Sequence, residues 1–184
     1  RLEAEMTEGT SQTSNKATTI IELTVADNTP SHYEASLQRD IDLIKSKIND
    51  MFQLDKRALE DSLKALVEGN KQLAYGVILR DQQVDELEKE VDRLCLEFMV
   101  RQQPVSVHLR FAYVTIKINQ ELERIGDYAE SIARQVLKTR EMNPKPPLDS
   151  FVKIATLTID MLDKSVKAFL DQDLELARKT MEIE

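Results

Sequence analysis

The sequence lacks several residue types that particular fold classes require. It holds one cysteine, no tryptophan, four glycines and five prolines in 184 residues. A single cysteine excludes an intrachain disulfide framework. The scarcity of glycine and proline favours long helices over a turn-rich sheet protein. No run of 18 apolar residues and no secretion signal occur, so we expect a cytoplasmic protein without a membrane span. Cys95 falls in an apolar stretch, which predicts a buried, inert thiol rather than a reactive or metal-binding one.

Positive charge is also scarce, since 33 acidic residues face 25 basic ones and the net charge is −8. A nucleic-acid-binding protein usually carries a basic stripe, and none is visible. An acidic surface is repelled by anionic lipids. We therefore expect protein partners and no nucleic acid, with any membrane association made through those partners.

Apolar residues recur at alternating spacings of three and four, which predicts long amphipathic helices. The expected helices span about 31–68, 71–102, 105–141 and 149–170, with another starting at 174. Ser31 is a plausible first cap, Gly69-Asn70 interrupts the pattern, and Pro104 ends the second helix. The expected apolar stripes are Leu37, Ile41, Ile44, Ile48, Met51, Leu59, Leu63 and Leu66, then Val84, Leu87, Val91, Leu94 and Phe98, and then Leu122, Ile125, Ala129, Ile132 and Val136. Long helices with short connections make an antiparallel bundle.

Two stretches of the chain resemble each other. LEDSLKALVEGNKQLA (59–74) aligns without gaps with LDKSVKAFLDQDLELA (162–177), an offset of 103 residues. This predicts an all-α fold of tandem three-helix bundles, with the first repeat at 31–141 and the start of a second at 149–184. Residues 1–30 are expected to be a disordered extension and 142–148 a proline-rich linker. Because the offset places Glu184 opposite Asp81, the second repeat is expected to be incomplete in this chain.

The stretch ELERIGDYAES (121–131) collects acids on one helix. At ~100° per residue, Glu123 and Asp127 share a face roughly opposite the apolar stripe, and Gly126 falls at its edge. A missing side chain there would let an ion, a ligand or a second backbone approach. A charged face on a bundle helix is also commonly just solvated, and Arg124 and Arg134 offer surface ion pairs.

The preceding helix carries a second acidic stripe, formed by Asp81, Asp85, Glu88 and Asp92. When the chain is folded back at Gln103, these acids reach heights similar to Glu123 and Asp127 on the neighbouring helix. Clustered carboxylates repel one another unless a cation lies among them. Carboxylate oxygens suit Mg²⁺, Ca²⁺, Mn²⁺ or Fe. The candidate metal ligands are Glu123, Asp127, Asp85, Asp81 and Glu88.

Signals for catalysis are missing. Neither His32 nor His108 lies in the E-x-x-H arrangement of a ferritin-type di-iron site. No phosphate-binding loop and no nucleophile elbow occur either. We therefore expect a protein that is not an enzyme.

The segment VDELEKEVDRLCLEFMVRQQPVSVHLRFAYVTIKINQELERIGDYAESIARQ (84–135) resembles the first repeat of the PhoU family, through QQPV, LR and LERIGD at their spacings. The resemblance implies a tandem pair of three-helix bundles. It also implies that the E-x-x-x-D motif, here Glu123 and Asp127, binds Fe, Zn, Mn or Mg ions, often as a small cluster, with Asp85 the first choice among companion acids. Two positions depart from the family pattern, since Ser131 stands where Asn is usual and His108 where Asp is usual. The family's second metal motif is absent from this chain.

The resemblance further implies a cytoplasmic regulator that represses the phosphate-starvation response. Such proteins link the ATPase of a phosphate ABC transporter to a sensor histidine kinase. The repeat that is cut short favours self-association, so we expect a homodimer. The competing hypothesis is a purely structural helical protein-interaction module without bound metal. Metal binding separates the two hypotheses.

Overall fold

The computed structural model describes residues 31–139 and 148–183, and within them it contains five helices and no strand. The helices are α2 (His32–Glu68), α3 (Lys71–Gln102), α4 (Ser106–Lys138), α5 (Asp149–Asp171) and α6 (Leu174–Met181). The predicted all-α class is confirmed, and the helix bounds agree except that α4 ends at Lys138 instead of near Glu141. The expected extension at 1–30, and the linker apart from Leu148, lie outside the described residues.

The start of α2 follows its sequence signal. The Ser31 hydroxyl accepts a hydrogen bond from the Glu34 backbone N–H (3.2 Å), and the Glu34 carboxylate accepts one from the Ser31 N–H (2.8 Å). This reciprocal pair is a capping box, which satisfies two backbone donors that the first helical turn leaves free. The chain divides into two compact units between Ala35 and Ser36, and the packing of the helices is that of the second unit.

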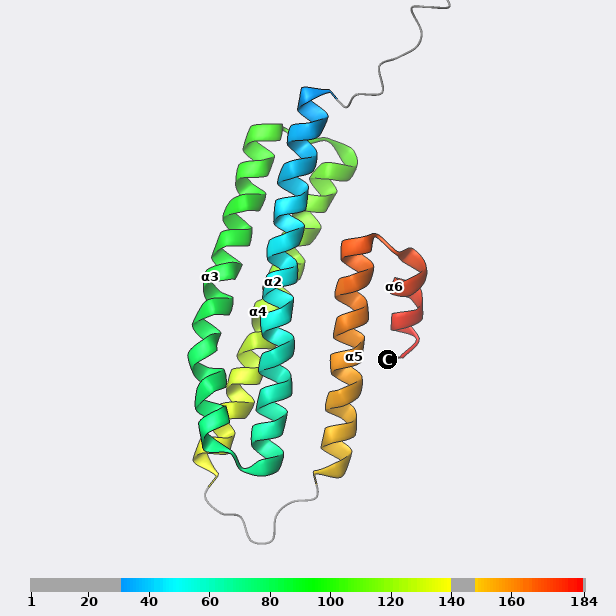
Figure 1. The fold of residues 1–184 in the computed structure, drawn as a ribbon. Helices are drawn as coiled ribbons and strands as arrows, with labels where there is room; N and C mark the ends of the chain where they lie inside the picture. The colour runs from blue at the N-terminus through cyan, green and yellow to red at the C-terminus, as the bar shows by residue number, and fades with distance from the viewer. Residues whose placement is uncertain (1–30, 140–147, 184) are drawn as a thin grey trace, which may run out of the picture. The chain divides into compact units, whose positions relative to one another are not determined.

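The long helices α2, α3 and α4 lie side by side and alternate in direction (Figure 1). The larger of two core clusters holds the stripe of α2 from Leu37 to Phe52 with large side chains of α3 and α4, including Phe98 and Leu122. The smaller cluster contains Ala65 of α2, and most of its buried members are alanines. Small side chains permit a shorter distance between helix axes. The two clusters thus form two apolar layers, one after the other along the length of the bundle.

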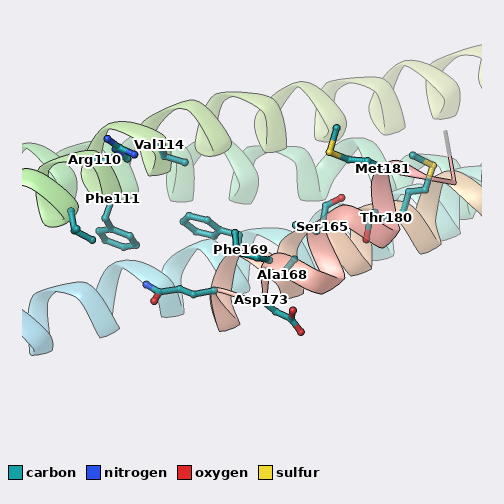
Figure 2. Close-up of a pocket in the computed structure, with 14 residues that line it drawn as sticks. Arg110, Phe111, Val114, Ser165, Ala168, Phe169, Asp173, Thr180 and Met181 are labelled. Atoms are coloured by element: carbon teal, nitrogen blue, oxygen red, sulfur yellow. The ribbon is translucent and has the colours of Figure 1, made fainter.

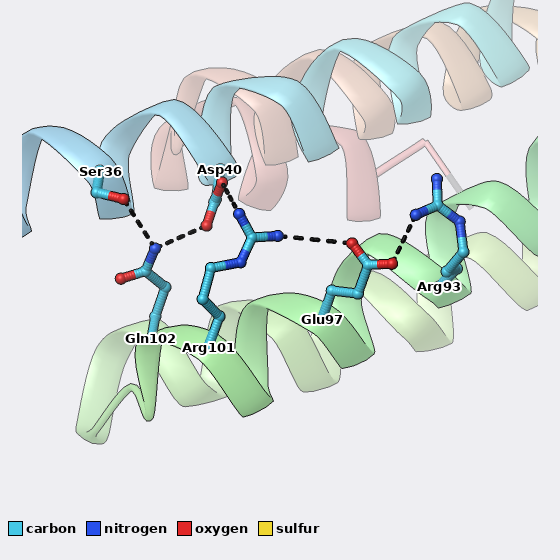
Figure 3. A network of polar contacts seen from close by, with 6 residues as sticks. All are labelled: Ser36, Asp40, Arg93, Glu97, Arg101 and Gln102. Atoms are coloured by element: carbon cyan, nitrogen blue, oxygen red, sulfur yellow. Dashed lines mark hydrogen bonds and ion pairs between the residues drawn. The ribbon is translucent and has the colours of Figure 1, made fainter.

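The turn between α3 and α4 is held by a polar network rather than by glycine. Gln103 has φ 44° and Ser106 has φ 50°, in the left-handed region that non-glycine residues rarely adopt. Next to it the buried Gln102 amide donates to Ser36 (3.1 Å) and Asp40 (2.8 Å) of α2. Figure 3 shows the network continuing from Asp40 through Arg101 and Glu97 to Arg93. These contacts fix α2 against the end of α3 and help to hold the turn in its conformation.

The predicted repeat is visible in the way two helices end. Gly69 (φ 69°) and Gln172 (φ 57°) are left-handed residues at the ends of α2 and α5, and they are 103 positions apart. Each is followed by a cap residue: Asn70 accepts from the Leu73 N–H (3.0 Å), and Asp173 accepts from the Leu176 N–H (2.9 Å). The matching backbone bonds, Asn70 N–H to Ala65 O and Asp173 N–H to Ala168 O, are both 2.9 Å. The α5–α6 connection thus repeats the α2–α3 connection.

Helix α5 packs along the bundle with one face only. The Lys56 ammonium pairs with Asp163 at 2.7 Å, the Lys45 ammonium donates to Leu170 O at 2.7 Å, and the Phe111 and Phe169 rings stack at 6.1 Å. The outer face exposes Phe151, Ile154 and Leu157. The apolar stripe of this helix is therefore only partly covered. None of the described helices is long and apolar enough to cross a membrane.

Candidate functional site

The predicted acids of α3 and α4 face one another across the two helices. Asp81, Asp85, Glu88 and Glu123 are half-buried, and Asp127 is exposed. Burial raises the pKa of Glu123, and the negative charges of Asp127, Glu88 and Asp85 raise it further. Carboxylates on α3 thus act on a carboxylate of α4, as the fold-back at Gln103 predicted. The expectation that the two acidic stripes reach similar heights is confirmed.

Asp81 lies at the inner edge of this group. Burial raises its pKa to about 6, and so do the charges of Glu130, Asp85, Asp127 and Glu123. Glu88 lies at the other end of the group. Burial raises its pKa as well, with Asp92 adding to the shift and Lys89 opposing it. Desolvation and like charges both disfavour an ionised carboxylate, so this group is held in an electrostatically unfavourable state.

A buried amide fixes the register of α3 and α4 beside these acids. Asn119 of α4 is fully buried, and its Nδ2 donates to Glu88 O (2.8 Å) and to the Asp92 carboxylate (3.0 Å). A bond from a side chain to a neighbouring helix backbone permits little sliding of one helix along the other. The relative height of the two acidic stripes is therefore set in part by this buried amide, which bonds to the α3 backbone and to Asp92 of the stripe itself.

The sequence reasoning missed one residue of the site, Asp55 of α2. Its side chain is 0% exposed, and neither carboxylate oxygen has a hydrogen-bond partner. Burial raises its pKa to about 8, and the charges of Asp81 and Glu123 contribute. The sequence did contain a signal that Asp55 lies on the core face of α2, because Asp55 and Ser62 continue the spacing of three and four residues beyond Met51. Of the predicted continuation, Leu59 and Leu66 pack against the smaller core cluster as half-buried side chains, while the fully buried positions of this stretch are Asp55, Ser62 and Ala65.

Gly126 explains how Asp55 reaches the acids of α3. The sequence placed this glycine at the edge of an outer acidic face, but the structure buries it between helices. A Cβ at Gly126 would lie 3.1 Å from Asp55 Oδ1, 3.2 Å from Val84 Cγ1 and 3.7 Å from Asp81 Oδ1. Side chains of α2 and α3 therefore occupy the space that the missing side chain leaves. No backbone enters it, in contrast to one of the expectations.

Basic side chains near the site are engaged elsewhere. Arg124 pairs with Glu121, Arg134 with Glu130, and Arg80 with Asp61. Within residues 31–139 and 148–183, no lysine or arginine forms an ion pair with Asp55, Asp81, Asp85, Glu88, Glu123 or Asp127. Arg124 and Lys89 lower the pKa values of Glu123 and Glu88, but burial and the neighbouring negative charges outweigh them, so the central acids are only partly compensated. Protonation, which the raised pKa values of Asp55 and Asp81 favour, or a cation from solution would neutralise them.

The carboxylates are not gathered into a finished ligand set. Among the described residues, no three His, Cys, Asp or Glu side chains are grouped as a metal ion would require. The donors nevertheless have the chemistry that a hard cation prefers, because all are carboxylate oxygens. Asp55 adds two buried oxygens without partners. The residues fit a cation chemically, and side-chain rotations between staggered rotamers would be needed to converge on it.

Cys95 does not belong to this site. Its thiol is fully buried in α3, and burial raises its pKa to about 12, with a smaller contribution from Asp92. A thiol with such a pKa stays protonated at neutral pH and is a poor nucleophile and metal ligand. The prediction of a buried cysteine is confirmed.

A separate apolar groove lies between α4, α5 and α6, with a volume of about 650 Å³. Figure 2 shows Phe111 and Val114 of α4 on one side, Phe169 of α5 beside them, and Met181 of α6 at the other end. Arg110 and Asp173 are its charged members. The groove contains none of the predicted metal ligands, so the acidic site and the groove are distinct features.

Fold and site together define a class of protein: a bundle of long helices in which the same capping arrangement occurs twice. Carboxylates without ion-pair partners among the described residues lie between its helices. The comparisons with known proteins name the family. Residues 48–136 match the PhoU domain. The chain is 33% identical over 149 residues to the phosphate-specific transport system accessory protein PhoU homolog of Aquifex aeolicus, which covers 79% of this chain and 66% of the relative.

Other relatives agree. PhoU homolog 1 of Thermotoga maritima is 30% identical over 141 residues, covering 76% of this chain and 61% of the relative. PhoU of Escherichia coli is 29% identical over 150 residues, covering 82% and 62%. The chain belongs to the PhoU family, as the motifs of residues 84–135 indicated. It spans less than two thirds of the length of these relatives.

Proposed function

We propose that this protein is a non-enzymatic, metal-binding regulator of phosphate uptake. One observation carries the metal-binding part: acids from three helices lie near one another and form no ion pair with a lysine or arginine of the described residues, and one of them, Asp55, is fully buried. The proposed ligands are Glu123 and Asp127 of α4 with Asp81, Asp85 and Glu88 of α3. A bound divalent cation, Fe, Zn, Mn or Mg, would supply the positive charge that these carboxylates lack.

The proposed role in phosphate uptake follows from the relatives. Those reported above are named as accessory proteins of the phosphate-specific transport system or as homologues of that protein. We propose that this protein acts in the cytoplasm as a dimer, and that it couples the ATPase of a phosphate ABC transporter to a sensor histidine kinase of the starvation response. Its own part in this coupling is to present helix faces whose spacing the metal site fixes.

The second candidate function is a helical protein-interaction module that works without metal. The groove between α4, α5 and α6 favours it, together with the exposed apolar side chains of α5 such as Ile154 and Leu157. Apolar surface of this kind is typical of protein–protein contacts. The two candidates share the partner-binding role and differ in whether the acidic layer takes up a cation.

Elemental analysis of the purified protein tests the proposal. The wild-type chain is compared with the double variant Glu123→Ala, Asp127→Ala. A charge-matched control is Glu121→Ala with Asp160→Ala, which removes two exposed acids outside the site. We expect bound metal in the wild type and in the control, and none in the site variant. If the wild-type protein stays free of Fe, Zn, Mn and Mg after exposure to each, the result favours the second candidate function, the interaction module without metal.

A further inference from the structure

The buried boundary between the two apolar layers has a polar residue on each of two helices. On α2, Phe52 belongs to the larger cluster and Ala58 packs on the smaller one, with Asp55 between them. On α3, Val84 and Ile78 mark the two layers, with Asp81 between them. Gly126 occupies the same boundary on α4, next to both aspartates.

The two aspartates point toward one spot at this boundary. Asp55 Oδ1 lies 3.1 Å, and Asp81 Oδ1 3.7 Å, from the position of a Cβ on Gly126. The two oxygens therefore cannot be farther apart than these two distances combined. Both Asp55 oxygens lack a hydrogen-bond partner, although the side chain is 0% exposed. An orphaned, fully buried carboxylate is among the costliest groups that a protein interior can hold.

A small cavity lies next to this boundary; apart from Asp81, Arg80 and Gly126 its lining is apolar, and Asp55 is not among its lining residues. Its volume is about 10 Å³, close to what a single water-sized sphere needs. Arg80 also borders it, but the Arg80 guanidinium is held by Asp61 and by Gly76 O. The only described basic residue at the cavity is thus committed to another acid.

We infer that Asp55 of α2 is an interior oxygen ligand of the cation site, so that one bound divalent cation is held by three helices. The inference rests on the metal-binding role proposed above and extends it to a helix that carries no E-x-x-x-D motif. Asp55 approaches from the core, while Glu123 and Asp127 approach from the solvent side. Cation binding then ties α2 to the α3–α4 pair and displaces any proton that the buried Asp55 carboxyl holds.

The test uses the full 184-residue chain, stripped of metal by a chelator and titrated with Mn²⁺ in a calorimeter. Asp55→Leu removes the oxygens and puts an apolar side chain of similar size in their place. Asp55→Asn removes the charge and keeps one oxygen. Asp50→Asn is the matched control, because Asp50 lies on the same helix and is exposed. The double variant Glu123→Ala, Asp127→Ala reports on the proposed site as a whole.

We expect Asp55→Leu to weaken Mn²⁺ binding by at least about tenfold, since altering even the outer partners of metal ligands costs that much. Asp55→Asn should weaken it less, and Asp50→Asn should bind as the wild type does. In metal-free buffer, Asp55→Leu should melt at a higher temperature than the wild type, because the unpaired carboxylate is gone. A given concentration of Mn²⁺ should raise the melting temperature of the wild type more than that of this variant.

Two failures are distinguishable. If Asp55→Leu binds Mn²⁺ with wild-type affinity and stoichiometry while the Glu123 and Asp127 variant does not, the inference about Asp55 is wrong and the proposed metal site stands. If the wild type binds no divalent cation, both are wrong. Should Asp55→Leu not fold, Asp55→Asn decides: unchanged Mn²⁺ affinity contradicts the inference, and weaker binding beside an unchanged Asp50→Asn supports it.

Discussion

Asp55 Oδ1 of α2 lies 3.1 Å from the point where a Cβ on Gly126 of α4 would stand, so an aspartate and a glycine on different helices share one site in the core. A glycine inside a helix costs roughly 1 kcal/mol relative to alanine. Packing of Val84 into the space of the missing side chain offsets part of this cost, and the Asp55 carboxyl occupies the same space. Gly126 and Asp55 are therefore coupled, and changes at either should be felt at the other.

The first prediction concerns Gly126→Ala. The added methyl would gain about 1 kcal/mol of helix propensity. It would also sit 3.1 Å from Asp55 Oδ1 and 3.2 Å from Val84 Cγ1, both buried on neighbouring helices. Overpacking of this kind costs roughly 1–3 kcal/mol. We expect a net loss of about 1 kcal/mol in the free energy of unfolding, measured by urea denaturation.

Gly76→Ala is the matched control for this prediction. Gly76 also lies inside a helix, but a Cβ there would meet only the flexible end of Arg80, at 3.9 Å. The helix-propensity gain should appear in full, and the variant should be more stable by up to about 1 kcal/mol. Equal stabilisation by Gly76→Ala and Gly126→Ala would show that the space beside Asp55 is not tightly filled.

The second prediction is a pH dependence of stability in metal-free buffer. The pKa of Asp55 is about 8 in the folded protein against a reference value of 3.8. Because the folded pKa is raised, the unfolded chain loses this proton at a lower pH than the folded protein does. The contribution of Asp55 to stability is therefore greatest below the reference pKa, and it declines until the pH passes the folded pKa. Asp81, with a pKa of about 6, acts in the same direction up to that pH.

The variant Asp55→Asn isolates the contribution of this residue. It cannot titrate, so the wild type should become less stable relative to it as pH rises from 5 to 8. The difference should be on the order of a few kcal/mol, given 1.36 kcal/mol for each pKa unit. Urea denaturation at several pH values with a chelator present measures it. A constant difference across this range would mean that Asp55 does not titrate as a buried acid.

Much of the fold can be predicted from the sequence, because single residues mark where its helices begin and end. Gly69 and Asn70 end α2 and cap α3, and Pro104 stands directly after the left-handed Gln103 at the end of α3. Backbone preferences of single residues decide these points. The heights of the acids on α3 and α4 were also predictable, since a tight turn and a fixed helical rise leave little freedom.

The interior of the site could not be predicted from the sequence in the same way. At Asp55 the helical spacing continued, but the residue type is polar, and the leucines nearby offered a more usual continuation. Whether Gly126 faces solvent or the core depends on where α2 packs against α3 and α4, which no periodicity within α4 contains. The convergence of carboxylates on a cation depends on side-chain rotamers and remains a prediction.

The third prediction concerns the thiol of Cys95. It is fully buried and its pKa is raised to about 12, so a disulfide reagent should react only after α3 opens. We expect labelling at pH 8 to be at least about a thousandfold slower in the native protein than in guanidinium. The chain has one cysteine, so the signal has a single source. Rapid native labelling would indicate local opening of α3 near this residue.

The fourth prediction uses the two equivalent caps of the repeat. Asn70→Ala and Asp173→Ala each remove a side-chain bond to a backbone N–H, at Leu73 and Leu176. Loss of such a cap costs roughly 1 kcal/mol. Asn70→Ala removes the cap of α3, a long helix of the bundle core, so the loss should appear in global unfolding. Asp173→Ala should act locally, because α6 has only eight residues and packs on α5.

Hydrogen exchange separates the two effects of this last prediction. In Asp173→Ala the amides of α6 should exchange faster while those of α3 keep their protection, and in Asn70→Ala protection should fall throughout α2, α3 and α4. The swaps Asn70→Asp and Asp173→Asn are the controls, because either side chain can cap a helix. If the swaps destabilise as much as the alanine variants, the shared cap is not what ends these helices. Retained stability in the swaps would mean that one capping chemistry serves both copies, as expected when α2–α3 and α5–α6 are repeats of a single unit.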